Sequence, residues 1–179
     1  TLLGLEAALS AQRGYTAELS VLEAKRGFCD LYAGTDGSNI TEGLGDSWDI
    51  VTDMAIKLVP GGHPYHALAE AAANAAREGD IDAADITAIT ASRPGMTTLT
   101  GPLHPKDLID MAHSPAYFLA AGAADKQFGW ANATQEKIDD PVIHGLIDKV
   151  SVGTEPTENV GAYRQGATVT IDTSDGRSA

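Results

Sequence analysis

Cysteine is almost absent from this chain of 179 residues, which has a single one, Cys29. One cysteine excludes an intrachain disulfide, a four-cysteine zinc site and an iron–sulfur cluster held by three or four cysteines of this chain. Cys29 lies in a segment that we expect to be helical, and we interpret it as a small buried residue rather than a nucleophile.

Basic residues are also scarce, with 12 Lys and Arg against 25 Asp and Glu and a net charge of −13. Nucleic acids and anionic membranes attract clustered cations, so this balance argues against both as partners. A small anionic substrate stays compatible, because the local field of a site differs from the net charge. No apolar run approaches the ~20 residues of a membrane span, and no basic-then-apolar signal segment opens the chain. We therefore expect a cytoplasmic protein.

Short periodic patterns are present, and they predict an α+β fold with a few-stranded, mainly antiparallel sheet. Helical spacing predicts helices at 2–13, about 20–33 and 64–79, and further helices after three prolines that follow a cap or hinge residue, Pro105, Pro115 and Pro141. Strands are expected at 85–91, 150–152 and 168–172, with extended chain over 48–58. Residues 35–45 predict a loop that ends at a domain boundary. The turn signal at 174–176 is followed by no recognisable second strand.

The segment 57–66 (KLVPGGHPYH) places a cation, two glycines and two histidines at the expected start of a helix. Free N–H groups and the positive helix end attract carboxylates or phosphates, Gly61 and Gly62 let a ligand approach the backbone, and Lys57 supplies full charge. His63 and His66 add proton transfer. The alternative is a plain Pro-Gly-Gly turn with two histidines in solvent.

Other candidate residues lie further along the chain. His113 and Ser114 precede a helix and either bind substrate or only cap that helix. Arg93 follows a strand and has the chemistry to hold a carboxylate bidentately. His63 and His66 have no third ligand at zincin spacing, so we expect no metal site.

Five segments occur in an order that resembles the MmgE/PrpD family, which includes 2-methylcitrate dehydratases, cis-aconitate decarboxylases and iminodisuccinate epimerases. They are 7–16 (AALSAQRGYT), 21–28 (VLEAKRGF), 57–66 (KLVPGGHPYH), 113–117 (HSPAY) and 140–143 (DPVI). The resemblance implies a large helical domain, formed by the N-terminal part and a C-terminal return, with a smaller α+β lid inserted before that return. On that template residues 1–48 belong to the helical domain and 49–179 to the lid, and the return is missing.

The resemblance also implies roles for two residues. Lys57 matches the lysine of the family's Lys-x-x-Pro loop, which would bind or polarise a substrate carboxylate, and His66 matches a histidine of many members. In the decarboxylase branch a histidine stands five residues after the lysine, where this chain has Gly62, with His63 one place later. This departure argues against decarboxylation.

The implied function is that of a cofactor-independent hydro-lyase acting on a small di- or tricarboxylate, similar to 2-methylcitrate dehydratase. It would abstract a proton α to a carboxylate and release water. Epimerisation of a dicarboxylate is one alternative, and a non-catalytic lid remnant that binds or assembles is another. We expect a homodimer. The family's N-terminal catalytic residues are absent here, so we expect the isolated chain to be inactive.

Overall fold

The computed structural model describes residues 2–163 and 166–179 and separates into two compact units, 1–55 and 56–179. The first unit contains three helices, α1 (Leu2–Gln12), α2 (Phe28–Ala33) and α3 (Asp49–Thr52). Among its described residues only Cys29 is buried, and its sulfur packs against Gly37. The unit therefore has almost no core of its own.

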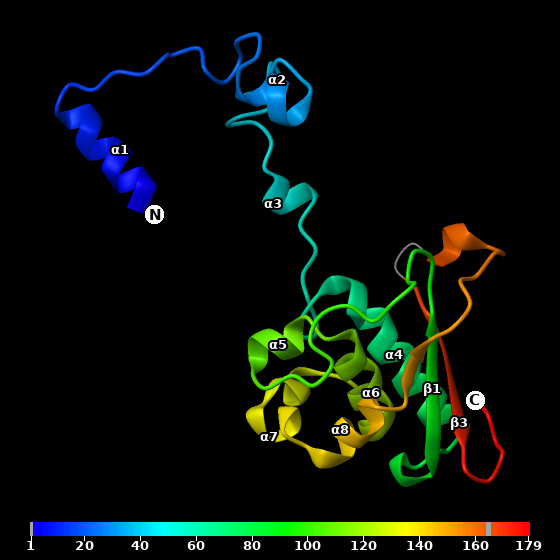
Figure 1. Cartoon of the computed structure of the whole chain (residues 1–179). Helices are drawn as coiled ribbons and strands as arrows, with labels where there is room; N and C mark the ends of the chain where they lie inside the picture. The colour runs from blue at the N-terminus through cyan, green and yellow to red at the C-terminus, as the bar shows by residue number, and fades with distance from the viewer. Residues whose placement is uncertain (1, 164–165) are drawn as a thin grey trace. The chain divides into compact units, whose positions relative to one another are not determined.

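The second unit packs a group of helices beside a small sheet (Figure 1). Its elements in chain order are α4 (His63–Glu78), η1 (Ala83–Asp85), β1 (Ile86–Ser92), α5 (Leu108–Ala112), α6 (Pro115–Asp125), η2 (Trp130–Ala133), α7 (Gln135–Ile138), α8 (Pro141–Ile147), β2 (Val150–Val152), η3 (Val160–Tyr163) and β3 (Thr168–Thr173). Helix α6 lies at the centre, in contact with α4, α8 and the sheet. The buried apolar core belongs to this unit.

The sheet has three strands in the order β2-β1-β3. Strand β1 pairs in parallel with β2, with Ile89 opposite Val150, and antiparallel with the longer β3, with Ile89 opposite Ile171. The predicted α+β class is confirmed, and the sheet is mixed. The chain after β3 turns back, and Ala179 exchanges two backbone hydrogen bonds with Ile171. As predicted, no strand follows the 174–176 turn in the described part of the chain, but residues 178 and 179 pair with β3 as an isolated bridge.

Helices α4 and α6 contact each other through very small side chains. The face of α4 that is buried carries Leu68 and otherwise only alanine: Ala69, Ala72, Ala73 and Ala76. On α6, a Cβ added to Gly122 would lie 2.4 Å from the carbonyl oxygen of Ala69. Any side chain at position 122 would thus separate the two helices.

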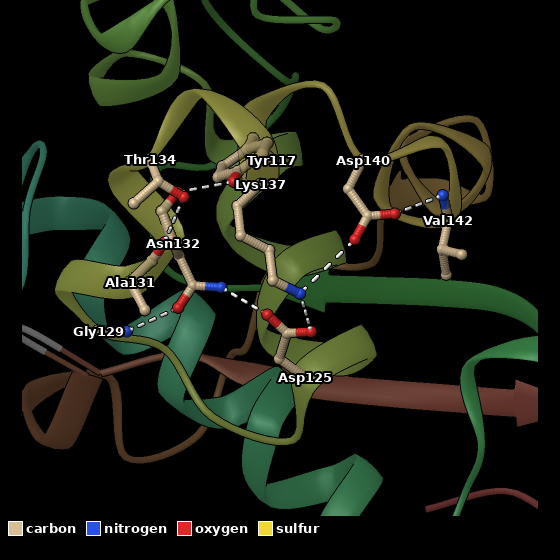
Figure 2. A network of polar contacts seen from close by, with 9 residues as sticks. All are labelled: Tyr117, Asp125, Gly129, Ala131, Asn132, Thr134, Lys137, Asp140 and Val142. Carbon is tan, nitrogen blue, oxygen red and sulfur yellow. Dashed lines mark hydrogen bonds and ion pairs between the residues drawn. The ribbon is translucent and has the colours of Figure 1, made fainter.

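A polar network ties η2 and α7 to α6, as Figure 2 shows. The Tyr117 hydroxyl donates to the carbonyl of Asn132 at 2.7 Å, and the Asn132 amide donates to Asp125 at 2.8 Å. Lys137 Nζ lies 2.7 Å from Asp125 and 3.5 Å from Asp140. Burial, and then the charges of Asp125 and Asp140, raise the pKa of Tyr117, so the hydroxyl keeps its proton and acts as a donor.

Most predicted elements are confirmed, and three are wrong. The helix predicted at about 20–33 begins only at Phe28, because Arg26 has a φ of 64° and breaks the helical path. Within the predicted extended chain 48–58, residues 49–52 form α3. The helix expected at Pro105 begins at Leu108, because Asp107 provides the cap by accepting from two backbone N–H groups. The division into 1–48 and a lid at 49–179 stays a prediction.

Candidate functional site

A groove of about 510 Å³ runs beside α4. Three groups of residues line it: Ile56, Leu58 and Val59 before the helix, the α4 residues His63, His66, Glu70, Ala73, Asn74 and Arg77, and Gln127 and Phe128 after α6. The α4 residues recur at intervals of three and four, so they share one side of the helix. The groove thus combines an apolar wall with a row of polar side chains.

The loop that leads into α4 is shaped by packing. Gly61 has a φ of 90°, and a Cβ there would lie 2.3 Å from the ring of Phe118. The N–H of Gly62 donates to the carbonyl of Ala112 at 3.1 Å. Packing therefore requires glycine at position 61, and the Gly62 N–H is already committed within the protein. Lys57 Nζ closes the loop by donating to the carbonyl of Gly61 at 2.8 Å.

His66 is the chemically unusual residue of this groove. Its Nε2 atom is buried and has no hydrogen-bond partner. The ring lies nearly parallel to that of Phe118, with 6.3 Å between centroids, and 5.2 Å from the ring of His63. An unpartnered buried polar atom costs free energy, and such atoms in native proteins often serve a ligand or a reaction.

The surroundings of His66 favour its neutral form. Burial lowers the pKa of His66 below its ordinary value, and the neighbouring His63 and Lys57 charges act in the same direction. The carbonyls of Gly61 and Pro60 act in the opposite direction but are the smaller influence overall. Neutral imidazole is the form that accepts a proton, so His66 fits a general base. The structure thus brings Lys57, His63 and His66 together.

The structure places His113 and Ser114 at the start of α6 and gives Ser114 a capping role. The buried Ser114 hydroxyl accepts from the N–H of Tyr117 at 3.1 Å and donates to the carbonyl of Leu103 at 3.4 Å. His113 is exposed, and its Nδ1 lies 2.7 Å from the carbonyl of Ile109. Neither residue lines the groove.

Arg93 is also outside the groove. It follows β1, and its guanidinium donates to the carbonyl of Pro64. Arg93 lines a second, smaller hollow that it shares with Tyr65 and Met96.

Several groove residues escaped prediction. Glu70, Asn74 and Arg77 follow His66 at positions four, eight and eleven, and this spacing was a usable signal once a helix was expected. Phe128 had no such signal, because its ring meets that of the buried Phe118, at 4.5 Å between centroids, only through the tertiary fold.

Within 2–163 and 166–179, no three His, Cys, Asp or Glu side chains are grouped to bind a metal ion. No helix in these ranges has the length and apolarity needed to cross a membrane.

One comparison with known proteins gave a match. The family model described as the MmgE/PrpD C-terminal domain matches residues 60–179, which include the helix that carries His66. No curated protein matches the chain.

Proposed function

Because the chain belongs to the MmgE/PrpD family, we propose that it forms one wall of the active site of a cofactor-independent lyase, which dehydrates a small di- or tricarboxylate of the 2-methylcitrate type. The observation that carries this proposal is the buried Nε2 of His66, which has no partner and lies beside two groups able to carry positive charge. Such an atom suits proton abstraction next to a carboxylate.

The proposed reaction begins with the neutral His66. Its Nε2 takes the proton on the carbon α to a substrate carboxylate, and the electron pair left behind spreads into that carboxylate. Lys57, whose Nζ is held by the carbonyl of Gly61 at 2.8 Å, would stabilise the added negative charge. Hydroxide then leaves from the β-carbon with a proton, for which His63 is the nearest donor in this wall.

Epimerisation shares the first step but returns the proton to the opposite face of the carbon. It needs a second acid on the far side of the substrate. His63 and His66 come from one turn of α4, so both stand on the same side of the groove. This arrangement supports elimination over a two-histidine epimerisation.

The test uses the complete reading frame that contains this chain, with 2-methylcitrate as substrate and ultraviolet absorbance of the alkene product as the signal. We expect His66→Gln to lower kcat by about 10² to 10⁴, the usual range for a lost general base. His113→Gln is the matched control, because this exposed histidine lies outside the groove, and it should leave kcat unchanged. Equal rates for wild type and His66→Gln would overturn the proposal, and a product with inverted configuration instead of an alkene would replace it with epimerisation.

A further inference from the structure

A second hollow, of about 210 Å³, lies beside the loop that follows β1. Strands β1 and β2 run in parallel, so their carboxyl ends and the loops that follow meet at one edge of the sheet. The two loops are joined there, since the N–H of Gly95 donates to the carboxylate of Glu155 at 2.6 Å. In sheets with parallel strands, this edge is the usual place for a ligand.

We propose that this hollow is a binding site for a small carboxylate, separate from the groove that holds His66, with Arg93 as its anchor. The Arg93 side chain is half-buried and reaches the carbonyl of Pro64 on α4. That hydrogen bond uses one of the five N–H groups of the guanidinium and fixes the orientation of the guanidinium plane. In the described part of the chain Arg93 donates to no other group, so the rest of its fork can pair with a carboxylate bidentately.

The rest of the hollow suits an acid of about four to six carbons. Thr98 and Thr100 supply hydroxyl groups, while Tyr65, Leu68 and Met96 supply an apolar wall for the carbon chain. The first turns of α4 and α6 border the hollow at Pro64 and Pro115 and add positive potential. The carboxylate of Glu155 accepts from the N–H of Gly95, so the loop already binds one carboxylate from the protein.

The hollow and the groove share no lining residue. The α4 residues in the hollow are Pro64, Tyr65 and Leu68, and those in the groove are centred on His66 and Glu70. At 3.6 residues per turn, the two sets lie on opposite sides of α4, about 180° apart. A ligand at Arg93 is therefore a second ligand and not the far end of one bound at His66.

The test is a succinate titration of this 18.6 kDa chain, followed by the backbone amide signals in nuclear magnetic resonance spectra. We expect saturable shifts at Gly95, Met96 and Thr98, at least tenfold weaker binding for Arg93→Gln, and unchanged binding for the control Arg77→Gln, which removes a cation from the groove instead. If Arg93→Gln does not fold, Arg93→Lys decides, because it keeps the charge and loses the bidentate fork; several-fold weaker binding supports the proposal.

Three results would overturn it: no shift at Gly95, Met96 and Thr98 in the wild type, the same affinity in the Arg93 variant, or equal weakening by Arg77→Gln. His66→Gln should leave these shifts intact. The outcome is thus independent of whether His66 is a catalytic base.

Discussion

At the scale of single residues, both the backbone conformation at position 61 and the neighbouring Phe118 ring require glycine there. The Gly61 φ of 90° is strained for any residue with a Cβ, and that Cβ would overlap the Phe118 ring at 2.3 Å. We predict that Gly61→Ala lowers the free energy of unfolding by about 2–4 kcal/mol, the sum of backbone strain and overpacking.

Gly145 in α8 is the matched control, because a Cβ there meets nothing within 4 Å and its φ is ordinary. Gly145→Ala should stabilise the protein by about 0.5–1 kcal/mol. Urea unfolding measures both variants, and similar midpoints for the two would contradict this view of the loop.

His66 gives a prediction about pH. Its pKa is lowered in the folded state, by burial first and then by His63, while the unfolded chain has the ordinary value of about 6.5. Between the lowered pKa and 6.5 the unfolded state binds more protons, so stability falls as pH falls through this window and does not change with this group above it.

We expect wild type to lose more stability than His66→Gln between pH 7.5 and 5, by urea unfolding at each pH. In the active enzyme, kcat/KM should fall as pH falls through the lowered pKa of the folded His66, because the base becomes protonated there. An identical loss of stability in wild type and variant would show that His66 is not the group responsible.

The sequence predicts the residues of the candidate site that could contact a ligand. It does not predict the residues that hold them in place. Lys57, His63 and His66 are close in the sequence, and a helix start holds them together in any fold. The aromatic ring that packs against His66 belongs to Phe118, 52 positions further along the chain. No local spacing in the sequence indicates this contact. From the sequence alone, Ser114 and Gly62 fit a ligand-binding role and a structural role equally well. The structure gives their polar groups partners within the chain.

At the scale of elements, the network of Figure 2 makes Lys137 important for the placement of α7 and α8. Hydrogen bonding to Asp125 raises the pKa of Lys137, so it stays charged, and it separates two partly buried carboxylates, Asp125 and Asp140. We predict that Lys137→Met destabilises the protein by about 1–3 kcal/mol, because both carboxylates lose their cation.

Lys126→Met is the control for this prediction. Lys126 also contacts two carboxylates, but those of Asp80 and Asp82 are 97% and 81% exposed. Exposed pairs contribute about 0–1 kcal/mol, so thermal unfolding should shift less for Lys126→Met than for Lys137→Met. The reverse order would mean that the network in Figure 2 has little energetic weight.

The helices that the sequence predicted well have local signals at their first residues. Helices α4, α6 and α8 each have proline in the first turn, and α6 and α8 also have a side-chain cap. The predictions of helix starts that failed lie where one local sequence signal competed with another. At 105–108, the proline suggested a start, but the Asp107 carboxylate, which accepts two N–H groups, determines it.

At the scale of the whole chain, the two compact units differ in what they bury. Nearly all buried residues of the described chain lie in 56–179, while unit 1–55 buries Cys29 alone and exposes the leucines of α1. We predict that the fragment 56–179 folds by itself, with a melting temperature within about 2 °C of the complete chain. Calorimetry measures this, and circular dichroism of fragment 1–55 is the companion experiment, which should show little cooperative melting. A large loss of stability in 56–179 would mean that residues 1–55 support its core.

The alanine and glycine contact between α4 and α6 has a consequence for the entropy of the site. Alanine and glycine have no rotamers, so this part of the α4–α6 interface loses almost no side-chain conformational entropy when the protein folds. For the same reason it has no alternative side-chain arrangements through which one helix could slide past the other. The two rings whose contact positions the proposed base, His66 on α4 and Phe118 on α6, are therefore held in fixed relation, and heat should disorder this pair only together with the whole unit.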